Sequence, residues 1–108
     1  MKFKELSNTG IKLSQICLGT MTWGEQNSLE EAKNQMDMAL DYDINFFDTA
    51  ELYPVPPDKN TYAKTEEYIG KWLTPQKREK IFLATKIAGK AESLTWIRKG
   101  KNQFDAAN

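Results

Sequence analysis

The sequence predicts an α/β protein whose centre is a parallel sheet of three strands with two helices packed against it. Three short apolar runs, at residues 16–21, 44–50 and 80–86, indicate buried strands. Two amphipathic stretches lie between these runs, and strands that alternate with helices in this way are typical of βα units in a parallel sheet. The 108 residues, of which 40% are hydrophobic and 28% charged, have the composition of one folded domain.

The chain is expected to begin with a β-hairpin over residues 1–16. The segments KFKEL and IKLSQI flank the turn SNTG, in which Asn8 and Gly10 suit a hairpin. The run ICLGTM at residues 16–21 then forms the first strand of the parallel sheet. Gly19 interrupts its apolar side chains, which is typical of a place where the backbone must approach another group closely.

The first helix is predicted to begin after Ser28, which forms a capping box with Glu31, and to extend to about Tyr42. Its apolar residues recur at spacings of three and four and are Leu29, Ala32, Met36, Ala39 and Leu40. The apolar run INFFDTA at residues 44–50 follows as the second strand.

A proline-rich loop leads to Thr65, the expected N-cap of a second helix that Pro75 stops. The residues of this helix that can face a core are Ile69, Trp72 and Leu73. The third strand, KIFLATK, ends at Lys86. From Ile87 to residue 108 the sequence turns polar and predicts a long loop. Two residues in this tail could cap a further helix: Asp105 and Asn108.

Charge balance and missing residue types exclude several functions. Lysine plus arginine equals aspartate plus glutamate, at fifteen each, so the chain has no basic excess to bind nucleic acid or an anionic membrane. The start MKFKELSN lacks an apolar signal core, and no apolar run approaches the roughly 20 residues that span a bilayer, which predicts a cytoplasmic protein. Histidine is absent, which excludes Ser-His-Asp triads and imidazole metal sites within this chain. The single Cys17 is expected to be a small buried hydrophobe.

Polar residues collect where the three predicted strands end. Gly19-Thr20-Met21 ends the first strand, Asp48 and Tyr53 follow the second, and Lys86 ends the third. Because the carboxyl ends of parallel strands share one edge of a sheet, we expect these residues to converge. The ordinary pKa of a tyrosine is roughly 10, and a nearby ammonium lowers it by favouring the phenolate. The pattern therefore predicts a proton-donating unit, with Tyr53 as the acid, Lys86 as its tuning charge and Asp48 as the anchor of Lys86.

Plainer interpretations stay open for these positions. Asp48 could bond loop amides, Tyr53 could pack on the following proline, and Lys86 could be a solvated strand-end residue. Glu51 is expected to be a solvated loop acid, although a carboxylate pair with Asp48 would suit a hydrolase. Trp23 is either a core aromatic or the wall of a binding cleft.

Two other segments are not expected to bind phosphate. The segment GTMTWG lacks the G-x-G-x-x-G spacing of a Rossmann phosphate loop. Three cations in the tail are expected to form a solvated charge run rather than a phosphate site: Arg98, Lys99 and Lys101.

Four segments, LGTMTWG, NFFDTAELYPVPP, TEEYIGKWL and KIFLATK, resemble in order and spacing the opening third of the aldo-keto reductases, especially the Tas-like bacterial branch. The resemblance implies the N-terminal part of a (β/α)₈ TIM barrel, with the hairpin as a plug at its bottom. It also implies reduction of small-molecule carbonyl compounds with NADPH and without a metal, Tyr53 being the proton donor. The residues implied to lie beside the nicotinamide are Gly19, Thr20, Met21 and Asp48, and those implied to line the substrate cleft are Trp23 and Gln26.

Several parts of that enzyme have no counterpart in this sequence. A full barrel has roughly 250 residues, and the family's fourth catalytic residue is a histidine after the fourth strand. We therefore expect residues 1–108 to be an N-terminal fragment of one barrel domain, inactive by itself and prone to self-association through exposed sheet edges. Asp43 stands where the family usually has a glycine to end the first helix. The alternative function is a non-catalytic barrel that binds a partner, similar to the potassium-channel β subunits.

Overall fold

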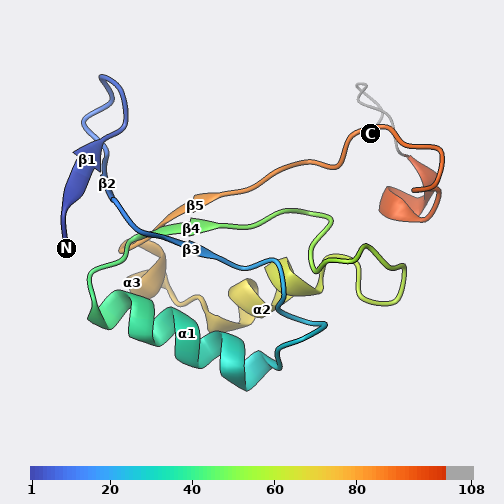
Figure 1. Cartoon of the computed structure of the whole chain (residues 1–108), viewed down its shortest axis with the longest axis horizontal. Coiled ribbons are helices and arrows are strands. Elements are labelled where there is room, and N and C mark those ends of the chain that lie inside the picture. Colours follow the sequence, from blue (N-terminus) through green and yellow to red (C-terminus); the bar gives the residue numbers. More distant parts are fainter. Residues whose placement is uncertain (102–108) are drawn as a thin grey trace.

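The computed structural model describes residues 1–101, and Figure 1 shows their arrangement. In chain order the elements are β1 (Phe3–Glu5), β2 (Lys12–Ser14), β3 (Cys17–Gly19), α1 (Leu29–Asp41), β4 (Phe46–Asp48), α2 (Lys64–Trp72), α3 (Pro75–Arg78), β5 (Phe82–Ala84) and the 3₁₀ helix η1 (Ile97–Gly100). Asp105 and Asn108, the candidate caps of a further helix, lie outside the described residues. Within residues 1–101, no helix has the length and apolar character needed to cross a membrane.

A parallel sheet in the order β3-β4-β5 forms the centre of the molecule, as the sequence predicts. Leu18, Phe47 and Leu83 form one row across this sheet. The helices α1, α2 and α3 lie together on one side of it (Figure 1). Each strand has three residues, so the strands are shorter than the apolar runs that predicted them.

The predicted hairpin of β1 and β2 lies at the amino-terminal end of the sheet. In its turn, Ser7 and Gly10 have φ angles of 48° and 75°, in the left-handed region that glycine adopts freely. Asn45, just before β4, holds the hairpin in place. Its side chain accepts a hydrogen bond from the Ser14 amide at 2.8 Å and donates to the Lys12 carbonyl at 3.0 Å. The hairpin is thereby fixed at the end of the sheet opposite the predicted site.

Helix α1 begins and ends as predicted. The Ser28 hydroxyl accepts from the Glu31 amide at 3.2 Å, and the Glu31 carboxylate accepts from the Ser28 amide at 2.8 Å, which completes the capping box. After the helix, Asp43 has a φ of 60°, and the Ile44 amide donates to the Ala39 carbonyl at 2.8 Å. Asp43 therefore adopts the left-handed conformation that glycine adopts at less steric cost.

The start of α2 differs from the prediction. The residue before the helix is Ala63, with a φ of 65° and no side-chain cap. Thr65, the predicted N-cap, is already inside the helix, and its hydroxyl donates to the Trp23 carbonyl at 2.6 Å in the buried interior. The need to satisfy that buried carbonyl explains why a polar side chain occupies this position.

Pro75 has a second role beyond stopping a helix, because it opens the short helix α3. Thr74 is the N-cap, and its hydroxyl accepts from the Lys77 amide at 3.2 Å. Proline suits the first helical position, where its missing N–H would have no intrahelical partner. The sequence pattern predicted two helices before the third strand, and the structure adds this third one.

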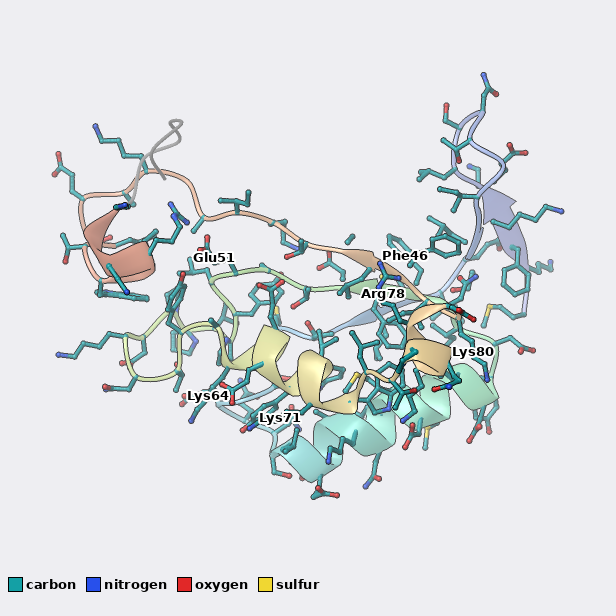
Figure 2. The ribbon with its side chains drawn as sticks, turned by 180° about the vertical axis from the view of Figure 1, so that it is seen from behind. Phe46, Glu51, Lys64, Lys71, Arg78 and Lys80 are labelled. Atoms are coloured by element: carbon teal, nitrogen blue, oxygen red, sulfur yellow. The ribbon has the colours of Figure 1, made fainter. Side chains whose placement is uncertain are left out.

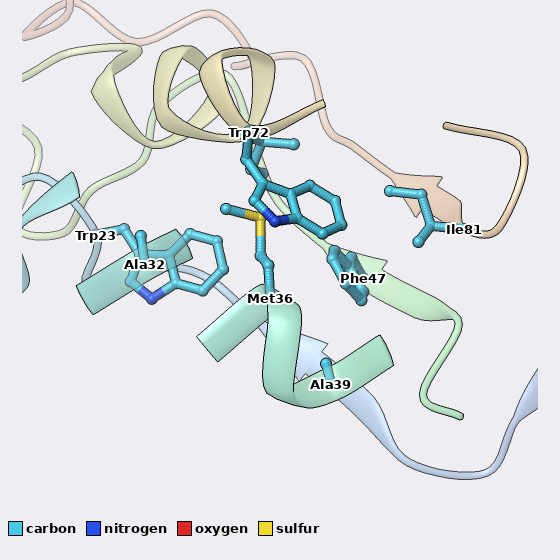
Figure 3. Close-up of a cluster of buried hydrophobic side chains, with 8 residues drawn as sticks. Trp23, Ala32, Met36, Ala39, Phe47, Trp72 and Ile81 are labelled. Carbon is cyan, nitrogen blue, oxygen red and sulfur yellow. The ribbon is translucent and has the colours of Figure 1, made fainter. Parts of the chain in front are cut away.

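The hydrophobic core lies between the sheet and the helices (Figure 3). Met36 of α1, Phe47 of β4 and Trp72 of α2 are 0%, 0% and 3% exposed. The rings of Phe47 and Trp72 are 5.8 Å apart between centroids. The indole N–H of Trp72 donates to Asp37 at 2.7 Å, so its polar edge is satisfied where the core meets solvent. The two predicted amphipathic helices thus bury their apolar sides on the sheet.

The opposite face of the sheet is more open than predicted. Cys17 and Phe82 are exposed and Phe46 is half-buried, because α1, α2 and α3 all lie on the other side. The expectation of a buried Cys17 is therefore wrong. Partial desolvation and the nearby Asp48 carboxylate raise the pKa of its thiol, which favours the protonated and less nucleophilic form.

Candidate active site

Parallel strand pairing delivers the predicted site residues to one edge of the sheet. Gly19, Asp48 and Ala84 form the last row of the register, at the carboxyl ends of β3, β4 and β5. Lys86 follows Ala84 by two residues, and Tyr53 follows Asp48 by five. Residues that are distant in sequence therefore share the edge at which parallel α/β sheets commonly bind ligands.

Asp48 and Lys86 form an open ion pair at this edge. The Lys86 ammonium donates to Oδ1 of Asp48 at 2.9 Å and to Oδ2 at 2.8 Å. The side chains of Lys86 and Asp48 are 51% and 39% exposed, so solvent or a ligand can reach the pair. The hydrogen bond to Asp48 is the main cause that raises the pKa of Lys86, and the Tyr53 side chain raises it further. Lys86 is therefore a positively charged ammonium near neutral pH.

The Tyr53 ring lies beside this ion pair. Nζ of Lys86 is 5.0 Å from the ring centroid, within the range of a cation–π contact. The Tyr53 amide donates to the Ala50 carbonyl at 3.2 Å, which forms a turn directly after β4. Tyr53 and Lys86 share a shallow depression, and its other lining residues are Ala50, Leu52, Ile87 and Ala88. The structure thus brings Asp48, Tyr53 and Lys86 into one cluster.

The segment after β3 forms a wall next to Asp48. Thr20 is 1% exposed, and its hydroxyl donates to the Asp48 carbonyl at 2.9 Å. Gly19 is exposed, and a Cβ placed on it would meet nothing within 4 Å. Met21 is exposed as well, while its carbonyl accepts from the Val55 amide at 2.9 Å. These contacts join the loops after β3 and β4 and leave Gly19 and Met21 open to a ligand.

The two expected substrate contacts lie in different surroundings. Trp23 is 1% exposed within the hydrophobic core, and its indole N–H donates to Gln35 of α1 at 3.0 Å. Because its large apolar surface packs against the core, Trp23 presents no face to a ligand, and the structure favours the core interpretation over the cleft wall. Gln26 is exposed in the loop before α1, and its contact with a substrate stays a prediction.

Glu51 lies in a half-buried network that the sequence did not predict. Figure 2 shows it on the loop after β4, facing the segment that follows β5. Its side chain is 18% exposed and pairs with Arg98, which is also 18% exposed. Its Oε2 accepts from the Tyr62 hydroxyl at 2.7 Å, and its Oε1 accepts from the Ala88 amide at 2.9 Å. The expectations of a solvated Glu51 and a solvated Arg98 are both wrong, whereas Lys99 is exposed as expected.

The sequence contains little signal for this network. Its central pair is 47 positions apart, in two segments without helical or strand periodicity. The signal available was an arginine in the polar segment after the third strand. No spacing rule indicates which carboxylate such an arginine meets.

The geometry favours proton transfer over carboxylate-pair hydrolysis. A hydrolase of the predicted kind needs Asp48 and Glu51 to act together. Each of them is instead engaged by its own cation, Asp48 by Lys86 and Glu51 by Arg98. The cluster that does form places a phenol beside an ammonium held by a carboxylate. Within residues 1–101, no group of three or more His, Cys, Asp or Glu side chains could hold a metal ion.

Comparison with known proteins shows which family the chain is similar to. The model of the aldo/keto reductase family matches residues 15–106. Protein tas of Escherichia coli (strain K12) is 43% identical over 90 residues, which cover 82% of this chain and 26% of that protein. A probable voltage-gated potassium channel subunit beta of Arabidopsis thaliana is 32% identical over 90 residues, covering 81% of this chain and 25% of that protein.

The fold has a counterpart in a solved structure. The crystal structure of the thermostable aldo-keto reductase Tm1743 with the inhibitor epalrestat matches with a TM-score of 0.62 and 31% identity. The match covers 81% of this chain and 31% of that one. The chain spans about a quarter of the length of the curated relatives it matches.

Proposed function

Because the chain belongs to the aldo-keto reductase family, we propose that it forms the proton-donating part of an enzyme that reduces aldehydes or ketones with NADPH. The observation that carries this proposal is the placement of Tyr53 beside Lys86, which Asp48 holds through both carboxylate oxygens. A carbonyl reduction needs one hydride at carbon and one proton at oxygen. The residues described here supply the second requirement.

Each residue of the cluster has a distinct role in the proposed reaction. Tyr53 donates its phenolic proton to the carbonyl oxygen as the alcohol forms, and solvent later returns a proton to the phenolate. The Lys86 ammonium stabilises that phenolate by its charge. Asp48 fixes the ammonium through two hydrogen bonds. When bound, the nicotinamide supplies the hydride to the carbonyl carbon.

The residues at the end of β3 fit one end of such a cofactor. Gly19 has no side chain, and the space where a Cβ would lie is open for a ligand. The exposed Met21 adds an apolar surface close to it in the chain. Thr20 and Asp48 are held together by the hydrogen bond between the Thr20 hydroxyl and the Asp48 carbonyl. We propose that these four residues lie beside the nicotinamide. The sequence contains no G-x-G-x-x-G phosphate loop. We therefore propose no residue of this chain as a ligand of the cofactor's phosphates.

A chimera tests the proposal directly. Residues 1–101 of this chain would replace the matching segment of protein tas, to which the chain is 43% identical. We expect the chimera to oxidise NADPH in the presence of some members of a panel of aldehydes and ketones. NADPH oxidation that is insensitive to Tyr53→Phe, or absent although the parent protein tas is active under the same conditions, would contradict it.

A second candidate function is a regulatory barrel without turnover. The observation that favours it is the similarity to the probable potassium channel subunit beta. This alternative predicts that the chimera binds NADPH, as measured by the cofactor's fluorescence. It also predicts that none of the aldehydes or ketones in the panel makes the chimera oxidise NADPH. Turnover that depends on Tyr53 would decide for the reductase.

For the 108-residue chain by itself we expect neither NADPH binding nor turnover. The sheet has two unpaired edges among the described residues, at β3 and β5, and an open face that carries Phe46 and Phe82. Exposed edges and apolar sheet surface favour self-association. Size-exclusion chromatography and NADPH fluorescence titration would check this. A sharp monomer peak with micromolar NADPH binding would contradict both expectations.

A further inference from the structure

We propose that Glu51 is a positioning residue, which clamps the loop carrying Tyr53 onto the segment carrying Lys86. Arg98 and Tyr62 hold the Glu51 carboxylate in place for this purpose. The effect on catalysis rests on the proposed reductase function, whereas the clamp itself is a structural claim that can be tested without turnover.

The main-chain hydrogen bonds that continue from β4 and β5 end at Glu51. Beyond this residue, the Glu51 side chain bonds to the second segment in their place. Beyond the strands, the Thr49 amide donates to the Ala84 carbonyl at 2.9 Å and the Glu51 amide donates to the Lys86 carbonyl at 3.0 Å. In a regular parallel ladder the next donor, the Ala88 amide, would bond the Glu51 carbonyl. It bonds Oε1 of Glu51 instead, at 2.9 Å. Glu51 therefore contacts the second segment twice, at the carbonyl of Lys86 and at the amide of Ala88.

Two side chains, those of Arg98 and Tyr62, bond to the Glu51 carboxylate and restrict it. Arg98 pairs with Oε1 through Nη1, and its Nη2 donates to the Ala88 carbonyl at 3.2 Å. Tyr62 donates to Oε2 at 2.7 Å, and its ring meets that of Trp96 edge-on at 5.4 Å between centroids. Burial, followed by the hydrogen bond to Glu51, raises the pKa of Tyr62, so its hydroxyl remains a donor.

The backbone at Arg98 is consistent with a segment held by its side chains. Arg98 and Lys99 have φ angles of 44° and 57°, in the left-handed region that residues with a Cβ rarely adopt. The Nε of Arg98 also donates to the Lys101 carbonyl at 2.9 Å. Contacts of the guanidinium thus favour this local conformation and direct Arg98 toward Glu51.

The clamp sets the spacing of the two proposed catalytic side chains. Tyr53 lies two residues after Glu51, and Lys86 two residues before Ala88. The depression in which Tyr53 meets Lys86 is lined only by residues of these two segments, 50–53 and 86–88, among those described. If the segments separate, the Lys86 ammonium leaves the face of the Tyr53 ring, from whose centroid it is 5.0 Å away.

Amide hydrogen exchange tests the clamp without any activity. In both the 108-residue chain and the tas chimera, Glu51→Ala is expected to speed exchange about tenfold or more in peptides covering residues 49–55 and 86–98 together, since each segment loses its partner. Glu51→Gln keeps an acceptor for the Ala88 amide but loses the charge that pairs with Arg98, so its effect should be smaller. Arg98→Lys keeps the charge and should retain part of the protection that Arg98→Ala loses.

Glu67→Ala is the matched control. It removes another ion-paired glutamate, bonded to Lys71 at 2.8 Å on the exposed side of α2, and should change neither segment. The proposal would be overturned if Glu51→Ala left the exchange rates of the two segments unchanged. This holds both when the segments stay protected and when they already exchange fast in the unsubstituted protein.

Kinetics of the chimera separate this inference from the proposed function. Glu51→Gln is expected to lower kcat about tenfold and to shift the pH dependence of kcat, with KM for NADPH unchanged, because misplacement of a catalytic group costs turnover. If Tyr53→Phe has no effect, the reductase proposal fails while the exchange result stands by itself. If Tyr53→Phe abolishes turnover and Glu51→Gln changes neither kcat nor its pH dependence, the positioning role is wrong.

Discussion

Two ion pairs lie near the same edge of the sheet, and they differ in burial. The side chains of Lys86 and Asp48 are 51% and 39% exposed, whereas those of Arg98 and Glu51 are both 18% exposed. The open pair has carboxylate and ammonium groups that a ligand can reach. The half-buried pair satisfies main-chain groups of a neighbouring segment through Ala88. This difference fits the two proposed roles, in which the first pair takes part in the chemistry and the second holds the loops that carry it.

The physical basis of this difference is solvent screening. An exposed ion pair gains little stability because water and salt weaken its attraction, and measured values lie at about 0–1 kcal/mol. Removal of one partner from a more buried pair leaves the other charge poorly solvated, which costs more. Substitutions at the open pair should therefore affect turnover more than stability, and substitutions at the half-buried pair should affect both.

The largest expected effect is that of Tyr53→Phe in the tas chimera. Turnover should fall by at least about a hundredfold, because a general acid typically contributes 10² to 10⁴. NADPH affinity and the free energy of unfolding should change little. Single-turnover NADPH oxidation and cofactor fluorescence would measure these quantities, and full turnover in the variant would remove Tyr53 from the mechanism.

Lys86→Met should lower turnover likewise and also change its pH dependence. The methionine keeps an unbranched side chain of similar length but removes the charge that stabilises the phenolate of Tyr53. The pH profile of kcat would check this, with Lys90→Met as a control for loss of a lysine in the same segment. A profile identical to that of the unsubstituted chimera would show that Lys86 does not tune the acid.

Glu51→Ala tests the half-buried pair of Glu51 and Arg98 through its effect on stability. It removes the carboxylate that accepts from Nη1 of Arg98, the Tyr62 hydroxyl and the Ala88 amide, so unfolding should become easier by about 1–3 kcal/mol. Urea denaturation of the chimera would measure the loss. Asp48→Ala, the matched change in the open pair, should cost less, and an equal cost for both would contradict the distinction drawn between the pairs.

The smallest expected effect is the pH dependence of the open pair's stability. Asp48 raises the pKa of Lys86 above its ordinary value of 10.5, so the pair stabilises the folded state below pH 10.5 and loses this contribution as pH rises through the higher folded-state value. Lys86→Met should therefore destabilise the chimera by less than about 1 kcal/mol near neutral pH. Above the folded-state value, the difference should vanish. A difference that persists there would mean that the side chain acts by packing.

Local patterns explain which parts of the fold were predictable. The capping box of Ser28 and Glu31 and the apolar spacing of α1 depend on residues within a few positions of each other. The alternation of strands and helices predicted the parallel sheet, and the sheet in turn predicted that Asp48 and Lys86 meet at its edge. These inferences needed no knowledge of side-chain packing.

Other features depended on packing that no local pattern encodes. Thr65 was expected to cap a helix, but the buried Trp23 carbonyl receives its hydroxyl. Trp23 had two open interpretations, and contact with α1 decided for the core. Cys17 was expected to be buried with its strand, but α1, α2 and α3 cover only the opposite face.

The sequence by itself therefore determined the order of the strands and helices, the ends of α1 and the edge at which Asp48, Tyr53 and Lys86 gather. Periodicity and strand polarity set these features, because they act between neighbours or through the regular geometry of a parallel sheet. Only the tertiary structure decided that Glu51 meets Arg98. That contact joins the loop after β4 to η1, 47 positions along the chain, and their approach depends on where the packed core places the ends of β4 and β5.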